Sequence, residues 1–354
     1  MIKVVMFDWG NTLMEELSGF PGPMHIWGTV QATPGIHEVL TALRGKYNLV
    51  VATNAVESNA IMVQKALKRV DLDEYFDRIY TARDLGWTKS DPQYYRTIFD
   101  DQSIAPEQAL MTGDALFADV EVPSRLGART IWLRRSTEKL HQLPMMDGEI
   151  TSLANWLPAF SMIEDEEIPS AAQLEELFHE YPPSNKLTRH VRMVAATAYL
   201  MAQALVDHGV DVSPIVVQRA GLLHDIDKRV WRDSGLLHGE KGAQILEGRR
   251  LHIIAEIVRR HQVFTILDPG RIPTTWEQKL VYLADKYIEK DQFVGISARF
   301  AHFMERYPES SDLLDAALPL AEQMETEMLL HLGQGRDLFY AGLKSRLRWL
   351  ADLT

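Results

Sequence analysis

Cysteine is absent from this chain of 354 residues, which excludes disulfide bonds and metal sites built from thiolates. Long apolar runs are also absent, since none approaches the ~20 residues that a membrane-spanning helix needs. The first residues enter a strand-like segment directly and lack the cationic, apolar and small-residue order of a signal peptide. We therefore expect a cytoplasmic protein that does not span a membrane.

Positive charge is in short supply. The chain has 37 Lys and Arg against 49 Asp and Glu, a formal net charge of −12. Nucleic acid is therefore not expected as the main partner, because its phosphates would be repelled. Binding of a small phosphorylated ligand through metal ions remains possible, since metals supply their own positive charge. The hydrophobic share of 46% and the length predict two folded domains, each with its own core.

The first part of the chain alternates between apolar runs and amphipathic stretches. The amphipathic stretches at 34–46 and 58–70 predict helices that cross between parallel strands. The buried parallel strands are expected at residues 2–7, 48–53, 109–114 and 129–134. This alternation predicts a doubly wound α/β domain over residues 1–162, with its site at the carboxyl ends of the strands.

A different pattern begins after an acidic, aperiodic segment at 163–170, which we interpret as a linker. Beyond it the apolar residues follow helical spacing, which predicts an all-α domain over residues 171–354. The C-terminal stretch 343–353 has the pattern of an amphipathic packing or dimerisation helix, so a homo-oligomer is a further expectation.

Polar residues suited to phosphoryl transfer fall at the expected ends of the strands. An aspartate such as Asp8 could attack phosphorus, while Thr53 and Lys89 could bind the phosphoryl oxygens. Asp8 with Asp114 could hold Mg²⁺, which prefers carboxylate oxygens, and Asp119 is a further candidate ligand. Lys89 would also offset the mutual repulsion of these carboxylates.

These segments, from FDWGNTL at 7–13 to GDALFAD at 113–119, resemble the haloacid dehalogenase superfamily, which consists mostly of phosphatases. The resemblance spans residues 1 to about 160 and implies a nearly capless member, since only residues 14–32 separate the first motif from the next helix. In the phosphatases of that family, the residue two positions after the nucleophile is an aspartate that acts as general acid and base. Here it is Gly10, which offers the metal only a backbone carbonyl, so we expect a weak or modified phosphatase site.

The second part of the chain carries histidines and aspartates in an order typical of a metal site. Such nitrogen and oxygen ligands suit Fe, Mn or Zn, and Asp225 could bridge two metal ions. Lys228 lies one helical turn beyond His224 and could reach the same phosphate. The candidate ligands are His190, His224, Asp225, His238, His261 and Asp285.

This order resembles the HD superfamily of metal-dependent phosphohydrolases over about residues 180–295. Within it, LLHDIDK, LLHGEKGAQIL and EQKLVYLADKYIE are most similar to the bacterial symmetrical dinucleoside tetraphosphate hydrolases. The resemblance implies a dinuclear site, with Fe or Mn expected, and a nucleotide as substrate. Asp227 departs from that group, which usually has a small or apolar residue there. The attached α/β domain is a second departure.

Three functions follow as hypotheses. The helical domain could hydrolyse a phosphoester or phosphoanhydride bond, possibly in a dinucleoside polyphosphate, while the α/β domain keeps some Mg²⁺-dependent phosphatase activity. Alternatively, only the helical domain is catalytic and the α/β domain binds, regulates or dimerises. The third hypothesis is a non-enzymatic nucleotide sensor. The aromatic residues Trp231, Phe264 and Trp276 could stack on a nucleobase or pack in the core.

Overall fold

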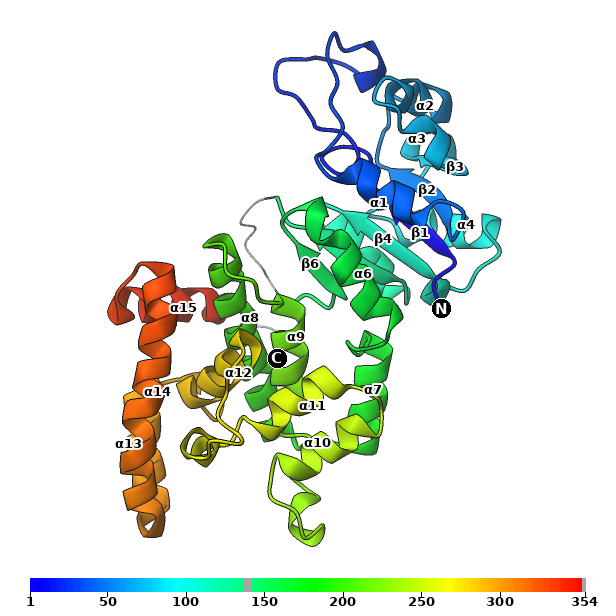
Figure 1. The fold of residues 1–354 in the computed structure, drawn as a ribbon. Coiled ribbons are helices and arrows are strands. Elements are labelled where there is room, and N and C mark those ends of the chain that lie inside the picture. Colours follow the sequence, from blue (N-terminus) through cyan, green and yellow to red (C-terminus); the bar gives the residue numbers. More distant parts are fainter. Residues whose placement is uncertain (136–141, 352–354) are drawn as a thin grey trace. The chain divides into compact units, whose positions relative to one another are not determined.

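A computed structural model describes residues 1–135 and 142–351 of the chain (Figure 1). The chain forms two compact units, of which the first reaches Asp165 and the second continues from Glu166. The first unit is α/β and the second is helical, which confirms the predicted fold class. Helix α6, Trp156–Glu164, extends two residues into the segment interpreted as a linker, because Ile163 is buried in the core of the first unit.

The first unit is built on a six-stranded parallel sheet with the strand order β3-β2-β1-β4-β5-β6. Strand β1 lies in the middle, and its last residue, Phe7, pairs with Val51 on one side and Thr112 on the other. Residues that follow β1 and β4 therefore emerge next to each other at one sheet edge. The strands are β1 Val4–Phe7, β2 Asn48–Thr53, β3 Arg78–Thr81, β4 Ala109–Gly113, β5 Arg129–Leu133 and β6 Gly148–Ile150.

Helices cover both faces of this sheet because successive strand residues point to opposite sides. Val5 and Phe7 pack with α1, Ile36–Leu43, α2, Ala60–Lys68, and α6. Val4 and Met6 pack on the other face, with residues of α4, Pro92–Asp101, and α5, Val122–Arg125. A short α3, Ala82–Leu85, follows β3. Both faces of β1 are thus buried, as expected for a continuous apolar run in a parallel sheet.

The four strands expected from the sequence are present, and two more complete the sheet. Strand β3 begins with the exposed Arg78 and has four residues, while β6 has only three. Strand β1 is equally short, but it belongs to a continuous apolar run, whereas β3 (RIYT) and β6 (GEI) mix polar or small residues with apolar ones and give no such run. Their place at the two ends of the strand order does not alter the position of the central strands.

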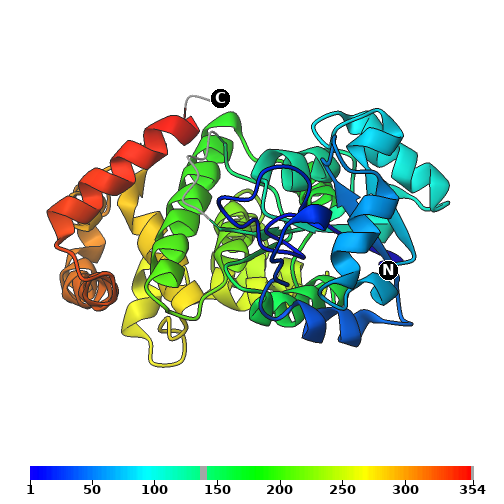
Figure 2. The same cartoon turned by 90° about the horizontal axis from the view of Figure 1, so that it is seen from above.

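The second unit is almost entirely helical, with one short hairpin formed by β7, Ile288–Glu289, and β8, Gln292–Phe293. The longest helix, α8, packs along α9, and α15 lies beside α8 (Figure 2). The helices are α7 Ala171–Glu180, α8 Asn185–Asp207, α9 Pro214–Leu223, α10 Glu240–Glu247, α11 His252–Arg259, α12 Trp276–Tyr287, α13 Ile296–Arg306, α14 Ser311–Leu332 and α15 Arg336–Ala351.

Helices α8 and α9 approach each other closely at Gly221. A Cβ atom added to this glycine would lie 2.6 Å from the Cα atom of Ala195 and 3.2 Å from its Cβ atom. Any side chain at Gly221 would therefore force the two helices apart. This contact matters for the site described below, because α8 carries His190 and α9 ends directly before His224.

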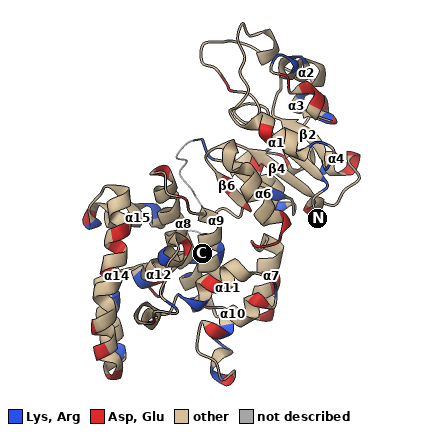
Figure 3. Ribbon diagram, viewed as in Figure 1, with Lys and Arg blue, Asp and Glu red and all other residues tan. Residues whose placement is uncertain are grey.

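The C-terminal helices differ in charge. Helix α14 carries five acidic residues and neither Lys nor Arg, whereas α15 is rich in basic residues (Figure 3). Arg336 at the start of α15 pairs with the buried Glu325 of α14 at 2.5 Å. Helix α15 continues the predicted amphipathic stretch 343–353 as far as Ala351, and the remainder of that stretch lies outside the described residues. Across residues 1–135 and 142–351, no helix combines the length and the apolar character that crossing a membrane requires.

Candidate functional sites

The candidate site of the α/β unit lies at the carboxyl ends of β1 and β4. Asp8 directly follows β1, and its backbone N–H donates to the carbonyl of Thr112 at 2.9 Å. Asp114 follows β4, and Asp119 lies in the short helical turn after it. Carboxylate oxygens of Asp8, Asp114 and Asp119 all lie within 4.8 Å of one another. The structure thus brings these three predicted acidic side chains close enough for one cation to bind all of them.

A buried lysine already provides one positive charge between these carboxylates. The Nζ atom of Lys89 donates to Asp8 and, at 2.5 Å, to Asp119, and Lys89 is only 1% exposed. Its backbone N–H donates to the side chain of Asn54 at 2.6 Å, which fixes the loop that carries it. Burial lowers the pKa of Lys89, but Asp119 and Asp8 raise it more, so the net shift is upward and the ammonium stays charged.

One lysine does not balance three carboxylates. Burial, opposed by Lys89 and reinforced by Asp119, raises the pKa of Asp8 to about 7. Burial and then Asp119 raise the pKa of Asp114 to about 6. A divalent cation would remove this excess of negative charge and favour the ionised forms. The oxygen donor set and its uncompensated charge therefore fit Mg²⁺.

Asp119 is positioned by the backbone around it. Its Oδ2 atom accepts from the backbone N–H of Ala115 at 3.0 Å, and its side chain is completely buried. Gly113 makes this placement possible, since a Cβ atom there would lie 2.2 Å from the same Oδ2 atom. The absent side chain at position 113 leaves the space that the carboxylate of Asp119 occupies.

The two remaining residues predicted for this site are Thr53, which offers a hydroxyl group, and Gly10, which offers only its backbone. Thr53 ends β2 and is buried, with its Oγ1 atom accepting from the backbone N–H of Ala55 at 3.3 Å. None of the side-chain contacts recorded among the described residues joins Thr53 to Asp8 or Lys89. Gly10 lies in the loop after β1, bridged to Met14. Their predicted roles in binding phosphate and metal remain predictions.

The candidate site of the helical unit collects side chains from α8 and α12 and from residues beside the ends of α9, α10 and α11. His190 comes from α8 and Asp285 from α12, while His224 and Asp225 follow directly after α9. The remaining two ligand candidates, His238 and His261, lie just before α10 and just after α11. The ring centroid of His224 lies 5.3 Å from that of His190 and 5.1 Å from that of His261. The rings of His238 and His261 are 5.0 Å apart. The structure thus brings all six predicted ligands together.

Two aspartates lie between these rings. Oδ1 of Asp285 is 3.2 Å from Nε2 of His190 and 3.7 Å from Nε2 of His224. Oδ2 of Asp225 is 3.7 Å from His224, while its Oδ1 is 2.8 Å from Nε2 of His238 and 3.7 Å from Nε2 of His261. The two oxygens of Asp225 therefore face different histidines, as a carboxylate between two metal ions would.

Three of the histidines are oriented by backbone carbonyls. Nδ1 of His190 bonds the carbonyl of Lys290 at 2.8 Å, and Nδ1 of His224 bonds that of Gly221 at 2.7 Å. Nδ1 of His261 bonds the carbonyl of Val258 at 2.6 Å. Because a carbonyl only accepts, Nδ1 carries a proton in each ring, which leaves the Nε2 lone pair of the neutral His224 and His261 available, whereas Nε2 of His190 lies 3.2 Å from Oδ1 of Asp285. This is the arrangement of metal-binding histidines, whose second nitrogen is held by a neighbouring acceptor.

His224 gives the clearest indication that these residues fit a metal ion. Its Nε2 atom is buried and has no hydrogen-bond partner within residues 1–135 and 142–351. Burial lowers the pKa of His224 to about 3, against the opposing effect of Asp225 and Asp285, so the ring is neutral at pH 7. Burial also lowers the pKa of His261. A buried lone pair without a donor is costly, and a metal ion would satisfy it.

Asp227 orients the fourth histidine, a role that the sequence did not reveal. Its Oδ1 atom lies 2.6 Å from Nδ1 of His238, while its Oδ2 atom accepts from the backbone N–H groups of Gly239 and Gly242 at 2.8 and 3.0 Å. Burial opposes ionisation, but the bond from His238 holds the pKa of Asp227 below its usual value. The residue that departs from the resembling group thus holds His238 in place.

Two lysines border the metal-ligand cluster. Nζ of Lys228 lies 3.1 Å from Oδ1 of Asp225 and 3.1 Å from Nε2 of His238, and its side chain is half exposed. Lys286 is buried and donates to Oδ2 of Asp285 at 2.7 Å and to the carbonyl of His261 at 2.6 Å. Lys228 is therefore placed to reach a substrate, whereas Lys286 fixes Asp285.

Two cavities adjoin Asp225. The larger, of about 600 Å³, is bordered by the ligand cluster and by the aromatic residues Trp231, Phe264 and Phe303. Trp276 is not among its lining residues and instead packs against His331. The cationic residues at its wall are Lys228, Arg232, Arg271, Lys286 and Arg299.

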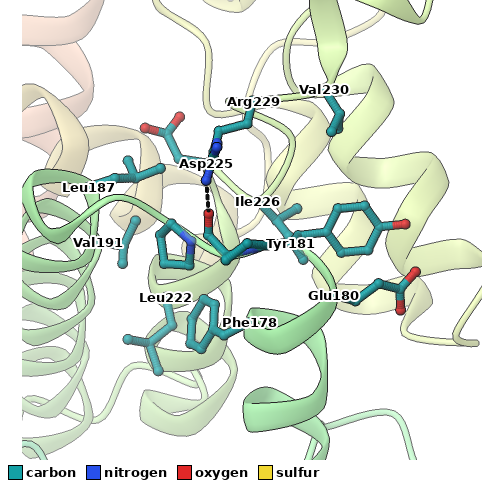
Figure 4. Close-up of a pocket in the computed structure, with 12 residues that line it drawn as sticks. Phe178, Glu180, Tyr181, Leu187, Val191, Leu222, Asp225, Ile226, Arg229 and Val230 are labelled. Carbon is teal, nitrogen blue, oxygen red and sulfur yellow. Dashed lines mark hydrogen bonds between the residues drawn. The ribbon is translucent and has the colours of Figure 1, made fainter.

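The smaller cavity, of about 270 Å³, lies beside Asp225 near the end of α7 (Figure 4). Its wall is mainly apolar, with Phe178, Leu222 and Ile226, and Arg229 donates to the carbonyl of Pro182 at 3.1 Å across it. Because this guanidinium is already bonded to the protein, the larger cavity is the better place for an anionic ligand.

Comparison with known proteins identifies both units. The family model for haloacid dehalogenase-like hydrolases matches residues 23–133, and the model for the HD domain matches residues 187–289. The first match begins after the Asp8 loop. The chain therefore joins a haloacid dehalogenase-like hydrolase domain to an HD domain.

Three relatives show what the chain is similar to. It is 24% identical over 106 residues to a glyceraldehyde 3-phosphate phosphatase of Pyrococcus furiosus, which covers 30% of this chain and 43% of the relative. It is 34% identical over 106 residues to a pyrimidine 5′-nucleotidase of Streptococcus pneumoniae, a match that covers 29% of this chain and 43% of the nucleotidase. An uncharacterized protein of Methanocaldococcus jannaschii is 32% identical over 134 residues, a match that covers 35% of this chain and 78% of that protein. The chain thus spans less than half of the phosphatase and of the nucleotidase.

Proposed function

We propose that this protein is a metal-dependent phosphohydrolase whose HD domain hydrolyses a phosphoester or phosphoanhydride bond of a nucleotide. The observation that carries the proposal is the buried Nε2 atom of His224, which has no hydrogen-bond partner in the described part of the chain. It lies 3.7 Å from Asp225 and from Asp285, with the neutral ring that metal binding requires.

The arrangement of the ligands supports two metal ions, for which we propose Fe or Mn. His190, His224 and Asp285 form one group, while His238 and His261 lie on the other side of Asp225. Imidazole and carboxylate ligands without thiolate suit these metals. When bound, a metal pair supplies an activated water molecule and positive charge for the phosphate oxygens.

The cavity beside the ligands supports a nucleotide as substrate. Lys228 points its ammonium into the site, so it can bind a phosphate oxygen of the substrate. Arg232 extends the cationic wall, while Arg271 and Arg299 at the same wall are paired with Asp268 and Glu289. Trp231 and Phe264 can stack on a nucleobase. A dinucleoside polyphosphate is one substrate that combines these features.

For the α/β domain we propose a weak or modified Mg²⁺-dependent phosphatase activity. Asp8 would attack phosphorus, with Lys89 and Thr53 binding the phosphoryl oxygens and Asp8, Asp114, Asp119 and the carbonyl of Gly10 holding Mg²⁺. The three carboxylates within 4.8 Å and the buried ammonium of Lys89 support this role. The competing proposals are a regulatory, binding or dimerisation module in this domain and a nucleotide sensor overall.

Metal analysis tests the dinuclear site. We expect about two transition metal ions per chain after reconstitution with Fe²⁺ or Mn²⁺, and at most one in Asp225→Ala. The matched control is Asp211→Ala, because Asp211 is exposed. A wild-type protein that binds no transition metal would contradict the dinuclear proposal.

A panel of nucleotides and sugar phosphates tests the chemistry. We expect Asp225→Ala to lower turnover of the nucleotide substrate by roughly 10²–10³-fold, the size seen when a group that stabilises transition-state charge is removed. Asp8→Asn should abolish only the activity that needs Mg²⁺, with the exposed Asp100→Asn as control. Full turnover of every substrate by Asp225→Ala would refute the proposed function of the HD domain.

A further inference from the structure

The space beside Gly10 is filled by a carboxylate from elsewhere in the same loop. A Cβ atom added to Gly10 would lie 2.3 Å from Oε1 of Glu16 and 3.0 Å from its Cδ atom. The carboxyl group of Glu16 thus occupies the place where a side chain at position 10 would begin. The backbone of Gly10 lies outside the positive-φ region, so the glycine is not required by backbone conformation.

Asn11 holds Glu16 in this place. The backbone N–H of Glu16 donates to Oδ1 of Asn11 at 3.1 Å, and Nδ2 of Asn11 donates to Oε2 of Glu16 at 3.4 Å. Asn11 adopts φ of 52°, a left-handed conformation that asparagine tolerates better than most residues. Because Oε2 is bonded to Asn11, the other oxygen, Oε1, is the one turned toward Gly10.

The neighbouring acid has a different environment. The carboxylate of Glu15 accepts from Nη2 of Arg135 at 3.1 Å, and Arg135 also donates to the carbonyl of Asn11 at 3.0 Å. Glu15 is therefore neutralised by an arginine. The two acids therefore differ in their contacts: Glu15 is paired with Arg135, while the carboxyl group of Glu16 is turned toward Gly10.

We infer that the carboxyl group of Glu16 is the general acid and base of the α/β domain, supplied from six residues beyond Gly10. This inference rests on the proposed phosphatase activity of that domain. Glu16 also lies close enough to Asp114 to act on it electrostatically, which places it at the same edge as the acidic cluster. Its exposure lets it exchange protons with solvent.

The proposed reaction has two steps. Oδ of Asp8 attacks phosphorus, the bond from phosphorus to the leaving oxygen breaks, and that oxygen takes the proton of the Glu16 carboxyl group. The Glu16 carboxylate then takes a proton from water, whose oxygen attacks the phosphorus of the aspartyl phosphate. The bond from phosphorus to Asp8 breaks, which releases inorganic phosphate and restores both carboxyl groups.

The test compares Glu16→Gln with Glu15→Gln in the full chain, with Asp225→Ala in every protein so that the HD domain does not contribute turnover. Asp8→Asn in the same background defines the activity that depends on the α/β site. With Mg²⁺ and glycerol phosphate, whose leaving group needs a proton, we expect Glu16→Gln to lower turnover by about 10²–10⁴-fold. Glu15→Gln should stay near the parent rate.

A second readout separates proton transfer from a structural effect. With p-nitrophenyl phosphate the leaving group needs no proton, so Glu16→Gln should release one equivalent of p-nitrophenol rapidly and then stall. Intact-protein mass spectrometry after acid quench should show the added phosphoryl group. The variant Gly10→Asp combined with Glu16→Ala should regain turnover, because the cleared space then accommodates an aspartate at position 10.

Each result decides between the two proposals. Glu16→Gln with parental turnover and no trapped phosphoryl-enzyme, beside an inactive Asp8→Asn, would overturn the role of Glu16 and leave the phosphatase activity standing. A parent whose turnover is unaffected by Asp8→Asn would overturn the phosphatase activity and with it this inference. Equal losses in Glu15→Gln and Glu16→Gln without rescue by the double variant would assign Glu16 a structural role and overturn the inference.

Discussion

In the α/β domain, a buried lysine lies between carboxylates, whereas in the HD domain imidazole rings surround carboxylates. The first arrangement supplies part of its own counter-charge, because Lys89 donates to both Asp8 and Asp119. The second leaves a buried nitrogen of His224 without a donor among the described residues. We therefore expect the α/β site to depend less on a bound metal ion than the HD site, where a metal ion would satisfy the buried nitrogen of His224.

The pKa shifts in the two sites point in opposite directions. Burial and neighbouring acids raise the pKa of Asp8 to about 7 and that of Asp114 to about 6. Burial also opposes ionisation of Asp225 and Asp285, but histidines and lysines around them hold both pKa values well below the usual range. The α/β site therefore has excess negative charge that a cation can compensate, and the HD site has ionised carboxylates that could serve as metal ligands.

The largest contrast is expected on removal of metal ions. If the free metal concentration before chelation is 1,000 times the dissociation constant of a site, removing the metal should lower the free energy of unfolding of the HD domain by about 4 kcal/mol for that site. The α/β domain should lose less, because Lys89 remains. Hydrogen exchange followed by mass spectrometry measures both domains in one sample. Equal loss of protection from exchange in α8 and in β1 would contradict the expected difference in metal dependence between the two domains.

Replacing the buried lysine tests the other half of the contrast. Lys89→Met leaves Asp8 and Asp119 without their partner, and removing one side of a buried ion pair costs about 3–5 kcal/mol. Urea unfolding of the α/β domain measures the loss, and added Mg²⁺ should recover part of it. The exposed Lys46→Met is the matched control. An unchanged unfolding midpoint for Lys89→Met would show that the carboxylates do not need the ammonium.

A smaller effect is expected at Asp227. Asp227→Asn replaces the oxygen that accepts from Gly239 and Gly242 with an amide donor, which loosens the orientation of His238. Loss of such a supporting residue typically weakens metal affinity about 10–100-fold. Competition with a metallochromic indicator measures it, with the exposed Asp233→Asn as control. Identical affinities in the two variants would mean that His238 is oriented by other contacts.

The sequence predicts the central strands because both faces of each are buried, which gives continuous apolar runs such as those around Val5 and Val51. It does not predict β3 and β6, because RIYT and GEI interrupt their few apolar residues with Arg, Thr, Gly and Glu and so form no continuous apolar run. The metal-ligand candidates of the HD domain were predictable from their residue types and order. Their mutual distances were not, because they lie in or beside five different helices that tertiary packing brings together.

The roles of Asp227 and Glu16 required tertiary structure. Asp227 differs from the residue usual in the resembling group, and only the distance of 2.6 Å to His238 reveals its purpose. Glu15 and Glu16 are identical residues in succession. Which of them faces Gly10 depends on the left-handed turn at Asn11, and neither composition nor spacing specifies that turn.

The glycine contact between α8 and α9 sets the distance between metal ligands on different helices. His190 lies five residues before Ala195, and His224 follows Gly221 by three residues, so both imidazoles sit about one turn from the contact. The spacing of His190 and His224 in the proposed metal site, and hence the ionic radius it accepts, depends on the absence of a methyl group on Gly221, whose backbone carbonyl also bonds Nδ1 of His224. Selectivity between metals could change here without any change in the ligands themselves.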